Sequence, residues 1–167
     1  ILIDVGGVLA LGENSKLEKG KFILSGVHTN VAKKLKISLD QYFDSIDTTY
    51  VSAITGKISK QKVIETLSKN FGVTAKKLKK FYLDSYKKYF KQNKELFQKL
   101  FKIKKQGYKI AVLSDQWCLS KEALMPKRIY QNFDEVIVSC DVGIRKPNPK
   151  IYKLTIKKLN LPPKEIL

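Results

Sequence analysis

Three short apolar runs along the chain have the length and the β-branched composition of buried strands. They lie at residues 1–9 (ILIDVGGVL), at residues 109–116 (KIAVLSDQ) and from residue 136 onward (VIVSC). Each run passes directly into polar or glycine-rich sequence, as a strand does where it leaves a sheet. The runs therefore predict three strands, each followed by a loop that carries polar side chains.

Helical periodicity accompanies the second and third runs. The spacing predicts a helix over residues 93–107, with Asn93 as its N-cap and Gly107 after its last turn, and another over about residues 149–159. A helix that directly precedes a strand is the order that a right-handed crossover between parallel strands requires. These elements predict a parallel sheet.

A lysine-rich segment with helical spacing separates the first run from the second. Ser59 is predicted to cap a helix over residues 60–71, and Thr74 is predicted to cap another over residues 75–90. The second helix carries an apolar and aromatic stripe, which we expect to be core between helices rather than a platform for substrate. The stripe consists of Leu78, Tyr82, Tyr86 and Phe90.

The expected fold class is α/β, a three-layer Rossmann-like parallel sheet with an inserted helical cap domain. Residues 1–10 and 91–167 would form the core and residues 11–90 the cap. The stretch LPPKEIL at residues 161–167 has the pattern of the entry to a further strand, and the sequence opens inside a strand without a methionine. We therefore expect a core truncated after its third strand and helix, in a piece of a longer chain.

Polar side chains follow each predicted strand. Asp4 ends the first apolar run, Ser114 and Asp115 end the second, and the third is followed by Arg145 and Lys146 before two prolines. Ligands of open α/β sheets bind at the carboxyl ends of the strands. Prolines stiffen the approach to the last helix and would hold the lysine on a rigid element.

The order strand–Asp, strand–Ser and strand–loop–Lys–Pro resembles three of the four motifs of the haloacid dehalogenase-like hydrolases. The resemblance implies that Asp4 is a nucleophile and that Ser114 and Lys146 bind the transferring group, so these three residues are the expected catalytic set. It also implies that Gly7 and Asp115 contribute with Lys146 to substrate binding. The helical insert resembles the cap of one branch of this family, which closes over the site and selects the substrate.

The resemblance further implies a magnesium ion, held by the Asp4 carboxylate and the backbone carbonyl of Gly6. The family's fourth, acidic motif would complete that metal site, and it is absent from these residues. An attacking carboxylate and a phosphate repel each other, so a metal ion, a lysine and hydrogen-bond donors must offset their charge.

Position 6 departs from the family pattern, because most phosphatases of this kind carry a second aspartate there. That aspartate protonates the leaving oxygen and later activates water, which is typically worth about 10²–10⁴ in rate. With Gly6 in its place, we expect aryl and acyl phosphates to be preferred over alkyl phosphates. A shallow dependence on the leaving group would indicate that a cap residue, such as His28 or an acidic neighbour, supplies the proton.

The expected function is hydrolysis of a small phosphorylated metabolite, a phosphomonoester, through an aspartyl-phosphate on Asp4. One alternative is a metal-independent 2-haloacid-type hydrolase that uses the same nucleophile, although those enzymes usually carry an aromatic hydroxyl where this chain has Gly6. The other is a catalytically silent binding module of the same family. For His28, the only histidine, we expect a surface or capping role rather than a catalytic one.

Composition sets limits on the partners. The net charge is +18, from 33 basic and 15 acidic residues. Only Arg128 and Arg145 are arginines, and the lysines are spread along the chain. Base-reading sites draw on arginine, asparagine and glutamine, so we expect no specific nucleic-acid partner. No apolar run approaches the roughly 20 residues of a membrane span. Cys118 and Cys140 lack metal-ligand spacing and suit a reducing cytoplasm, which is the expected location.

Overall fold

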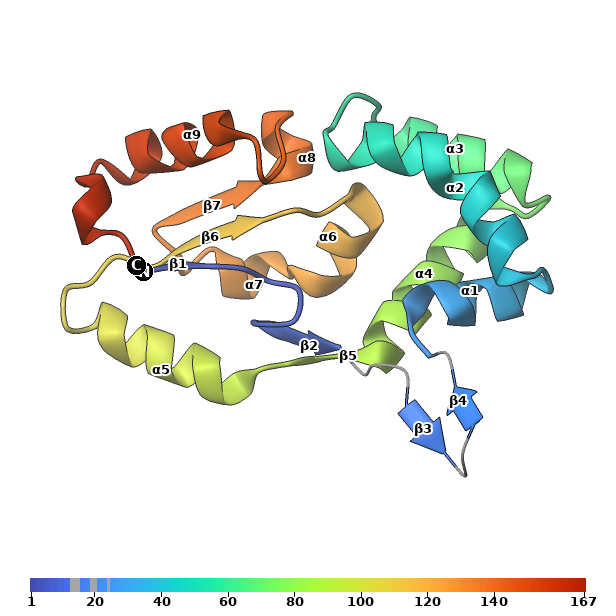
Figure 1. Ribbon diagram of the computed structural model, residues 1–167, viewed down its shortest axis with the longest axis horizontal. Coiled ribbons are helices and arrows are strands. Elements are labelled where there is room, and N and C mark those ends of the chain that lie inside the picture. Colours follow the sequence, from blue (N-terminus) through green and yellow to red (C-terminus); the bar gives the residue numbers. More distant parts are fainter. Residues whose placement is uncertain (13–15, 19–20, 24) are drawn as a thin grey trace.

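The computed structural model describes residues 1–12, 16–18, 21–23 and 25–167. A parallel sheet lies at its centre, with the strand order β1 (Leu2–Ile3), β6 (Ala111–Ser114), β7 (Glu135–Val138), as Figure 1 shows. Leu2 lies opposite Ala111, and Ser114 lies opposite Val138. The predicted strands and their parallel arrangement are confirmed.

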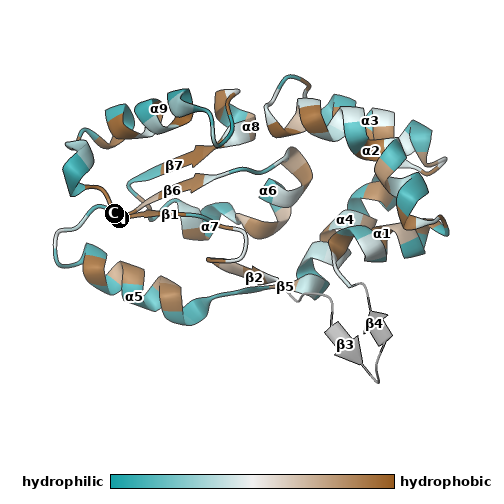
Figure 2. Ribbon diagram, in the orientation of Figure 1, coloured by the Kyte–Doolittle hydropathy of each residue, from teal (hydrophilic) through white to brown (hydrophobic). Residues whose placement is uncertain are grey.

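Alternate residues of the strands face opposite layers of helices, because side chains alternate across a strand. Val112 belongs to the large core that includes Phe97 of α5 (Lys94–Lys104). Leu113 instead packs with Ile151 of α9 (Pro149–Leu159), on the other face. Figure 2 shows β6 and β7 as apolar, and the helices as apolar on only part of their surface. The result is the three-layer α/β core expected from the sequence.

The helix ends of the core follow the predicted signals closely. The Asn93 side chain accepts a hydrogen bond from Leu96 N at 3.2 Å and caps α5. This helix ends at Lys104, slightly before Gly107, whose φ of 93° suits a glycine. The last helix, α9, has the predicted bounds and begins with proline.

β1 forms one edge of the sheet in the described residues and is half-buried. Leu2 N donates a hydrogen bond to the Leu167 carbonyl at 2.6 Å, so the last residue lies beside this edge. The α-amino group of Ile1 donates to the Lys109 carbonyl at 2.7 Å. Both ends of the chain therefore lie together, as Figure 1 shows.

Four helices form a second group beside the carboxyl ends of the strands (Figure 1). They are α1 (Val27–Leu35), α2 (Leu39–Ile54), α3 (Lys60–Asn70) and α4 (Ala75–Tyr89). Ser59 and Thr74 cap α3 and α4 through hydrogen bonds from Lys62 N and Lys77 N, as predicted. The stripe on α4 is core between helices, since Leu78, Tyr82 and Tyr86 are almost fully buried.

The insert contains strands as well as helices, so the expectation of an entirely helical insert is wrong at its two ends. β2 (Ala10–Gly12) pairs with β5 (Phe90–Gln92), and β3 (Lys16–Glu18) pairs with β4 (Lys21–Ile23), both antiparallel. Strands of three residues are too short to show a period of two in the sequence. The predicted domain boundaries at residues 10/11 and 90/91 cut through the first pair and stay a prediction.

The helical group touches the core at a few defined points. Lys60 of α3 forms an ion pair with Glu122 at 2.6 Å, and Gly56, at φ 61°, lies directly against the Cys140 carbonyl. The remaining short elements are α6 (Cys118–Leu124), α7 (Lys127–Tyr130), α8 (Ser139–Val142) and the 3₁₀ turn η1 (Pro163–Glu165). Across the ranges that the structure describes, every helix is too short or too polar to cross a bilayer.

Candidate active site

The chain turns sharply after β1 and brings Asp4 to the carboxyl edge of the sheet. The Val5 carbonyl accepts hydrogen bonds from Val8 N (3.2 Å) and Ala10 N (2.8 Å). Gly7 has a φ of 77°, a left-handed conformation that only glycine adopts without steric cost. Gly7 N donates to the Ala10 carbonyl at 2.9 Å, so it serves the turn, and its assignment to substrate binding stays a prediction.

Asp4 and Lys146, 142 residues apart in the chain, form an ion pair at this edge. Lys146 Nζ lies 2.6 Å from Asp4 Oδ2 and 3.5 Å from the Leu113 carbonyl. Asp4 Oδ1 accepts a hydrogen bond from Val5 N at 2.6 Å, which fixes the carboxylate. The Asp4 side chain is 39% exposed and that of Lys146 is 26% exposed, so both are partly accessible to solvent.

Asp115 holds the lysine-bearing loop in place. Its Oδ1 accepts a hydrogen bond from the backbone N of Lys146 at 3.1 Å. The structure thus brings together Asp4, Asp115 and Lys146, which the sequence placed at the ends of three different strands. Their convergence follows from the parallel topology, because parallel strands deliver their carboxyl ends to one edge.

Ser114 lies beneath this surface rather than on it. Its residue is fully buried, and its Oγ accepts a hydrogen bond from Gln116 Nε2 at 3.1 Å. Gln116 is itself held by Ser139, whose Oγ accepts from Gln116 N at 3.1 Å. Gln116 therefore covers Ser114, a feature that the sequence did not predict. The position of Gln116, two residues after the end of β6, is the signal that could have indicated it. The transferring-group role of Ser114 stays a prediction.

A cavity of about 280 Å³ separates the core edge from the helical group. We call it the site cavity. Its core wall includes Gly6, Asp115 and Gln116, and its opposite wall includes His28 and Tyr50. The helical insert thus forms the second wall of a cavity whose core wall includes Gly6, two residues after Asp4.

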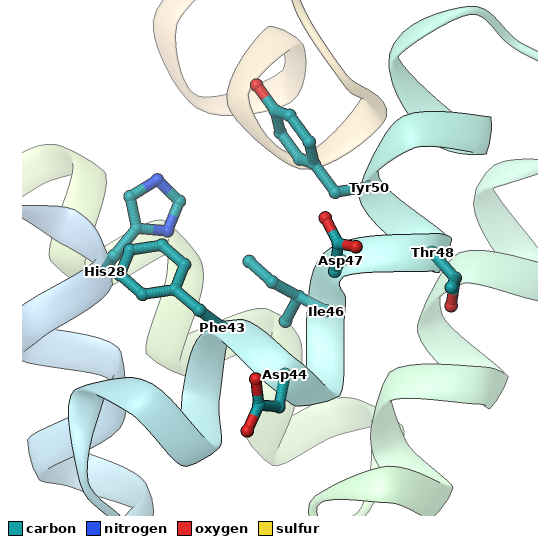
Figure 3. Close-up of a pocket in the computed structure, with 7 residues that line it drawn as sticks. All are labelled: His28, Phe43, Asp44, Ile46, Asp47, Thr48 and Tyr50. Carbon is teal, nitrogen blue, oxygen red and sulfur yellow. The ribbon is translucent and has the colours of Figure 1, made fainter.

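A larger cavity of about 570 Å³ lies within the helical group, and we call it the cap cavity. Figure 3 shows its lining, with Phe43, Asp44 and Asp47 from α2 and the imidazole of His28 from α1. His28 and Tyr50 line both cavities. These two side chains therefore connect the linings of the two cavities.

His28 makes no capping hydrogen bond, so the capping part of the sequence expectation is wrong. It is half-buried, and α1 begins after Gly26 without a side-chain capping hydrogen bond. Burial lowers the pKa of the His28 imidazole below its usual 6.5. No signal in the GVHTN segment indicated this, because the position of His28 depends on how α1 packs against α2 and α4.

Two phenols of the site cavity, those of Tyr50 and Tyr86, stay protonated near neutral pH. Burial raises the pKa of Tyr86 to about 12. Burial also raises the pKa of Tyr50, with Asp115 adding to the rise and Arg145 opposing it. These hydroxyls can donate hydrogen bonds but do not exchange protons readily at pH 7.

The oxygen atoms at the sheet edge are of the chemical type that binds magnesium. The Asp4 carboxylate and the Gly6 carbonyl are hard oxygen ligands, which this cation prefers. In the part of the chain that the structure describes, no group of three or more histidine, cysteine, aspartate or glutamate side chains is gathered for a metal. These residues would therefore hold the ion with few protein ligands.

The family model of the haloacid dehalogenase-like hydrolases matches residues 25–167. This is most of the chain, and it includes Ser114, Asp115 and Lys146, whereas Asp4 precedes the matched residues. The chain belongs to the haloacid dehalogenase-like hydrolase family.

Individual relatives cover a smaller part. The chain is 31% identical over 80 residues to bifunctional epoxide hydrolase 2 of Rattus norvegicus, covering 45% of this chain and 14% of that protein. It is 28% identical over 85 residues to a glyceraldehyde 3-phosphate phosphatase of Methanopyrus kandleri, covering 50% of this chain and 36% of that protein. The matches thus span well under half the length of these relatives.

The fold has close structural counterparts. A HAD family enzyme from Bacteroides thetaiotaomicron, crystallised in complex with magnesium and inorganic phosphate, superposes with a TM-score of 0.72. The superposition covers 98% of this chain and 80% of that one, at 19% sequence identity. The counterpart confirms the fold class for the core and the helical group together.

Proposed function

We propose that the protein is a magnesium-dependent phosphomonoester hydrolase that works through an aspartyl-phosphate on Asp4. The observation that carries the proposal is the ion pair of Asp4 and Lys146 at the carboxyl edge of the sheet, 2.6 Å apart and partly exposed. A phosphatase among the relatives, and magnesium with inorganic phosphate in a structural counterpart, support it. The proposed substrate is a small phosphorylated metabolite.

The chemistry requires one carboxylate oxygen to attack phosphorus. As the bond from Asp4 to phosphorus forms, the bond to the ester oxygen breaks, and the departing oxygen takes up a proton. Water then attacks the same phosphorus, the aspartyl bond breaks, and the water loses a proton. Lys146 lies within contact of the attacking carboxylate, so its ammonium group can also stabilise the negative charge of the phosphoryl oxygens.

The supporting residues keep this geometry. The hydrogen bond from Val5 N leaves Asp4 Oδ2 as the oxygen that faces the lysine. Asp115 holds the backbone of Lys146 and thereby its position in the loop. Magnesium, held by the Asp4 carboxylate and the Gly6 carbonyl when bound, would supply further neutralisation of phosphate charge.

The test is an assay of the full-length protein with p-nitrophenyl phosphate, in the presence and absence of magnesium. We expect magnesium-dependent phosphate release, and its loss in Asp4→Asn, since an amide of nearly the same shape cannot attack phosphorus. Asp40→Asn, an exposed aspartate of α2, is the matched control and should retain full activity. Far-ultraviolet circular dichroism checks that both variants fold.

Other outcomes would overturn the proposal. Chloride release from 2-chloropropionate without metal would identify a haloacid hydrolase, and release of neither product would identify a silent binding module. Retention of more than a few per cent of the activity by Asp4→Asn would exclude Asp4 as the nucleophile.

A further inference from the structure

The proposed reaction needs a proton donor that the Gly6 position lacks. The departing ester oxygen must gain a proton, and the water that follows must lose one. Gly6 stands in the core wall of the site cavity without a side chain, and His28 stands in the opposite wall of the same cavity. A cavity of about 280 Å³ is small for a ligand site, so a bound ester would contact both walls.

The imidazole of His28 is held in one orientation. Its Nδ1 lies 2.8 Å from the Tyr42 hydroxyl, and the Tyr42 hydroxyl lies 2.7 Å from the Tyr82 hydroxyl. Tyr42 and Tyr82 are fully buried, so this chain of hydroxyl groups is part of the rigid core of the helical group. No residue that the structure describes bonds to Nε2 of His28, which leaves that nitrogen available to a ligand.

The remaining titratable groups of the site cavity are less suited to proton exchange. Burial raises the pKa of the Tyr50 and Tyr86 phenols, and Trp117 Nε1 donates to the Tyr86 hydroxyl at 3.1 Å. Asp115 accepts the backbone hydrogen bond that holds Lys146. Among the lining side chains, the imidazole is the group whose ordinary pKa lies nearest neutrality.

We propose that His28 is the general acid and base of the reaction, acting from the cap in place of the side chain missing at Gly6. The assignment rests on the proposed phosphatase function. In the first step the imidazolium gives its proton to the ester oxygen as the bond from that oxygen to phosphorus breaks and the bond to Asp4 forms. In the second step the neutral imidazole takes a proton from the attacking water, and the aspartyl bond breaks.

The charged and titratable neighbours determine the pH at which His28 can act. From α2, Tyr42 contacts its Nδ1, and Tyr50, Asp44 and Asp47 line the cap cavity with it. The site cavity adds Tyr86, Tyr89 and the Asp115 carboxylate. Burial favours the neutral form of the imidazole. The acid form is therefore populated on the acid side of neutrality.

The test is a series of leaving groups assayed with the full-length protein and His28→Gln. For p-nitrophenyl phosphate, whose leaving group departs unprotonated, we expect kcat/KM to change by less than about threefold, since general acid help is small for such esters. For ethyl phosphate, we expect a loss of about 10²–10⁴, the usual worth of a general acid. Activity on the aryl ester also shows that the variant folds.

The pH dependence gives a second readout. kcat/KM reports the steps up to formation of the aspartyl-phosphate, so for ethyl phosphate it should fall as the pH rises through the pKa of His28. His28→Gln should lose this limb of the profile. Tyr42→Phe keeps the imidazole but removes its hydroxyl partner, and it should lower the ethyl phosphate rate in part. Thr48→Ser, which changes an exposed residue of the cap cavity away from His28, should affect both esters equally.

Two results would overturn the assignment, and they are distinguishable. If the wild-type protein hydrolyses both esters and His28→Gln shifts them equally or not at all, His28 is not the proton donor, and the proposed function stands. If the wild-type protein releases phosphate from no ester with magnesium present, the proposed function fails and the assignment fails with it.

Discussion

Gly6→Asp would place a carboxyl group in the wall of the site cavity without straining the turn. A Cβ built on Gly6 has Gln116 Nε2 as its nearest neighbour at 4.0 Å, an ordinary van der Waals separation. Unlike Gly7, Gly6 is outside the set of residues with positive φ. We therefore expect the free energy of unfolding to stay within about 0.5 kcal/mol of the wild-type value, as for a substitution that disturbs no packing.

The expected gain in rate follows from the value of a proton donor. General acid help of about 10²–10⁴ corresponds to about 2.7–5.4 kcal/mol of transition-state stabilisation, at 1.36 kcal/mol for each factor of ten. In the His28→Gln background, Gly6→Asp should raise kcat/KM for ethyl phosphate by at least about 10²-fold, the lower end of that range. In the wild-type background the gain should be smaller, because His28 already supplies the proton.

The assay is phosphate release from ethyl phosphate and p-nitrophenyl phosphate, compared among the single and double variants. Gly6→Asn is the matched control, since it has the same shape without an acidic proton, and it should recover nothing. An equal recovery by Gly6→Asn would refute the reasoning, because the effect would then come from hydrogen bonding or shape. Thermal unfolding of each variant checks that the turn tolerates the side chain.

Three further predictions concern the ion pair, the cap contact and the metal. Lys146→Ala should lower kcat/KM on the order of 10²-fold or more with unchanged thermal unfolding, and an unchanged rate would show that another lysine serves. Gly56→Ala places a Cβ against the Cys140 carbonyl, at a residue with positive φ. The left-handed backbone alone costs about 1–2 kcal/mol, so the melting temperature should fall. An unchanged melting temperature would contradict the contact. Residues 1–167 should bind magnesium only at about 1 mM or weaker, because Asp4 and one carbonyl are few ligands; sub-micromolar binding by calorimetry would contradict this.

The predicted part of the site depends on signals that are local in the sequence. An apolar run that ends in a carboxylate marks Asp4, and the two prolines after Lys146 mark a rigid loop before a helix. Parallel topology then brings these ends to one edge, so the Asp4–Lys146 contact could be foreseen from strand order alone. The same holds for the helix starts at Ser59 and Thr74, where a single capping side chain decides the boundary.

The missed part depends on packing between elements distant in the chain. His28 reaches the site cavity because α1 packs on α4 and contacts α2, and its ring lies against Tyr42 and Phe43 at 5.6 and 5.7 Å between centroids. Ser114 is covered because Gln116 is anchored by Ser139, the first residue of α8. The hydrophobic periodicity of the sequence does not predict contacts between elements that are distant in the chain.

The ion pair of Asp4 and Lys146 contributes little to the stability of the fold. An ion pair with side chains 39% and 26% exposed contributes only about 0–1 kcal/mol to folding, so Asp4 and Lys146 are not there to hold the protein together. The fold is stabilised elsewhere, by the fully buried β6 and by Tyr42, Tyr82 and Trp117. Because the pair adds so little to stability, its loss should be felt in activity rather than in folding, which is what the proposed function requires of Asp4 and Lys146.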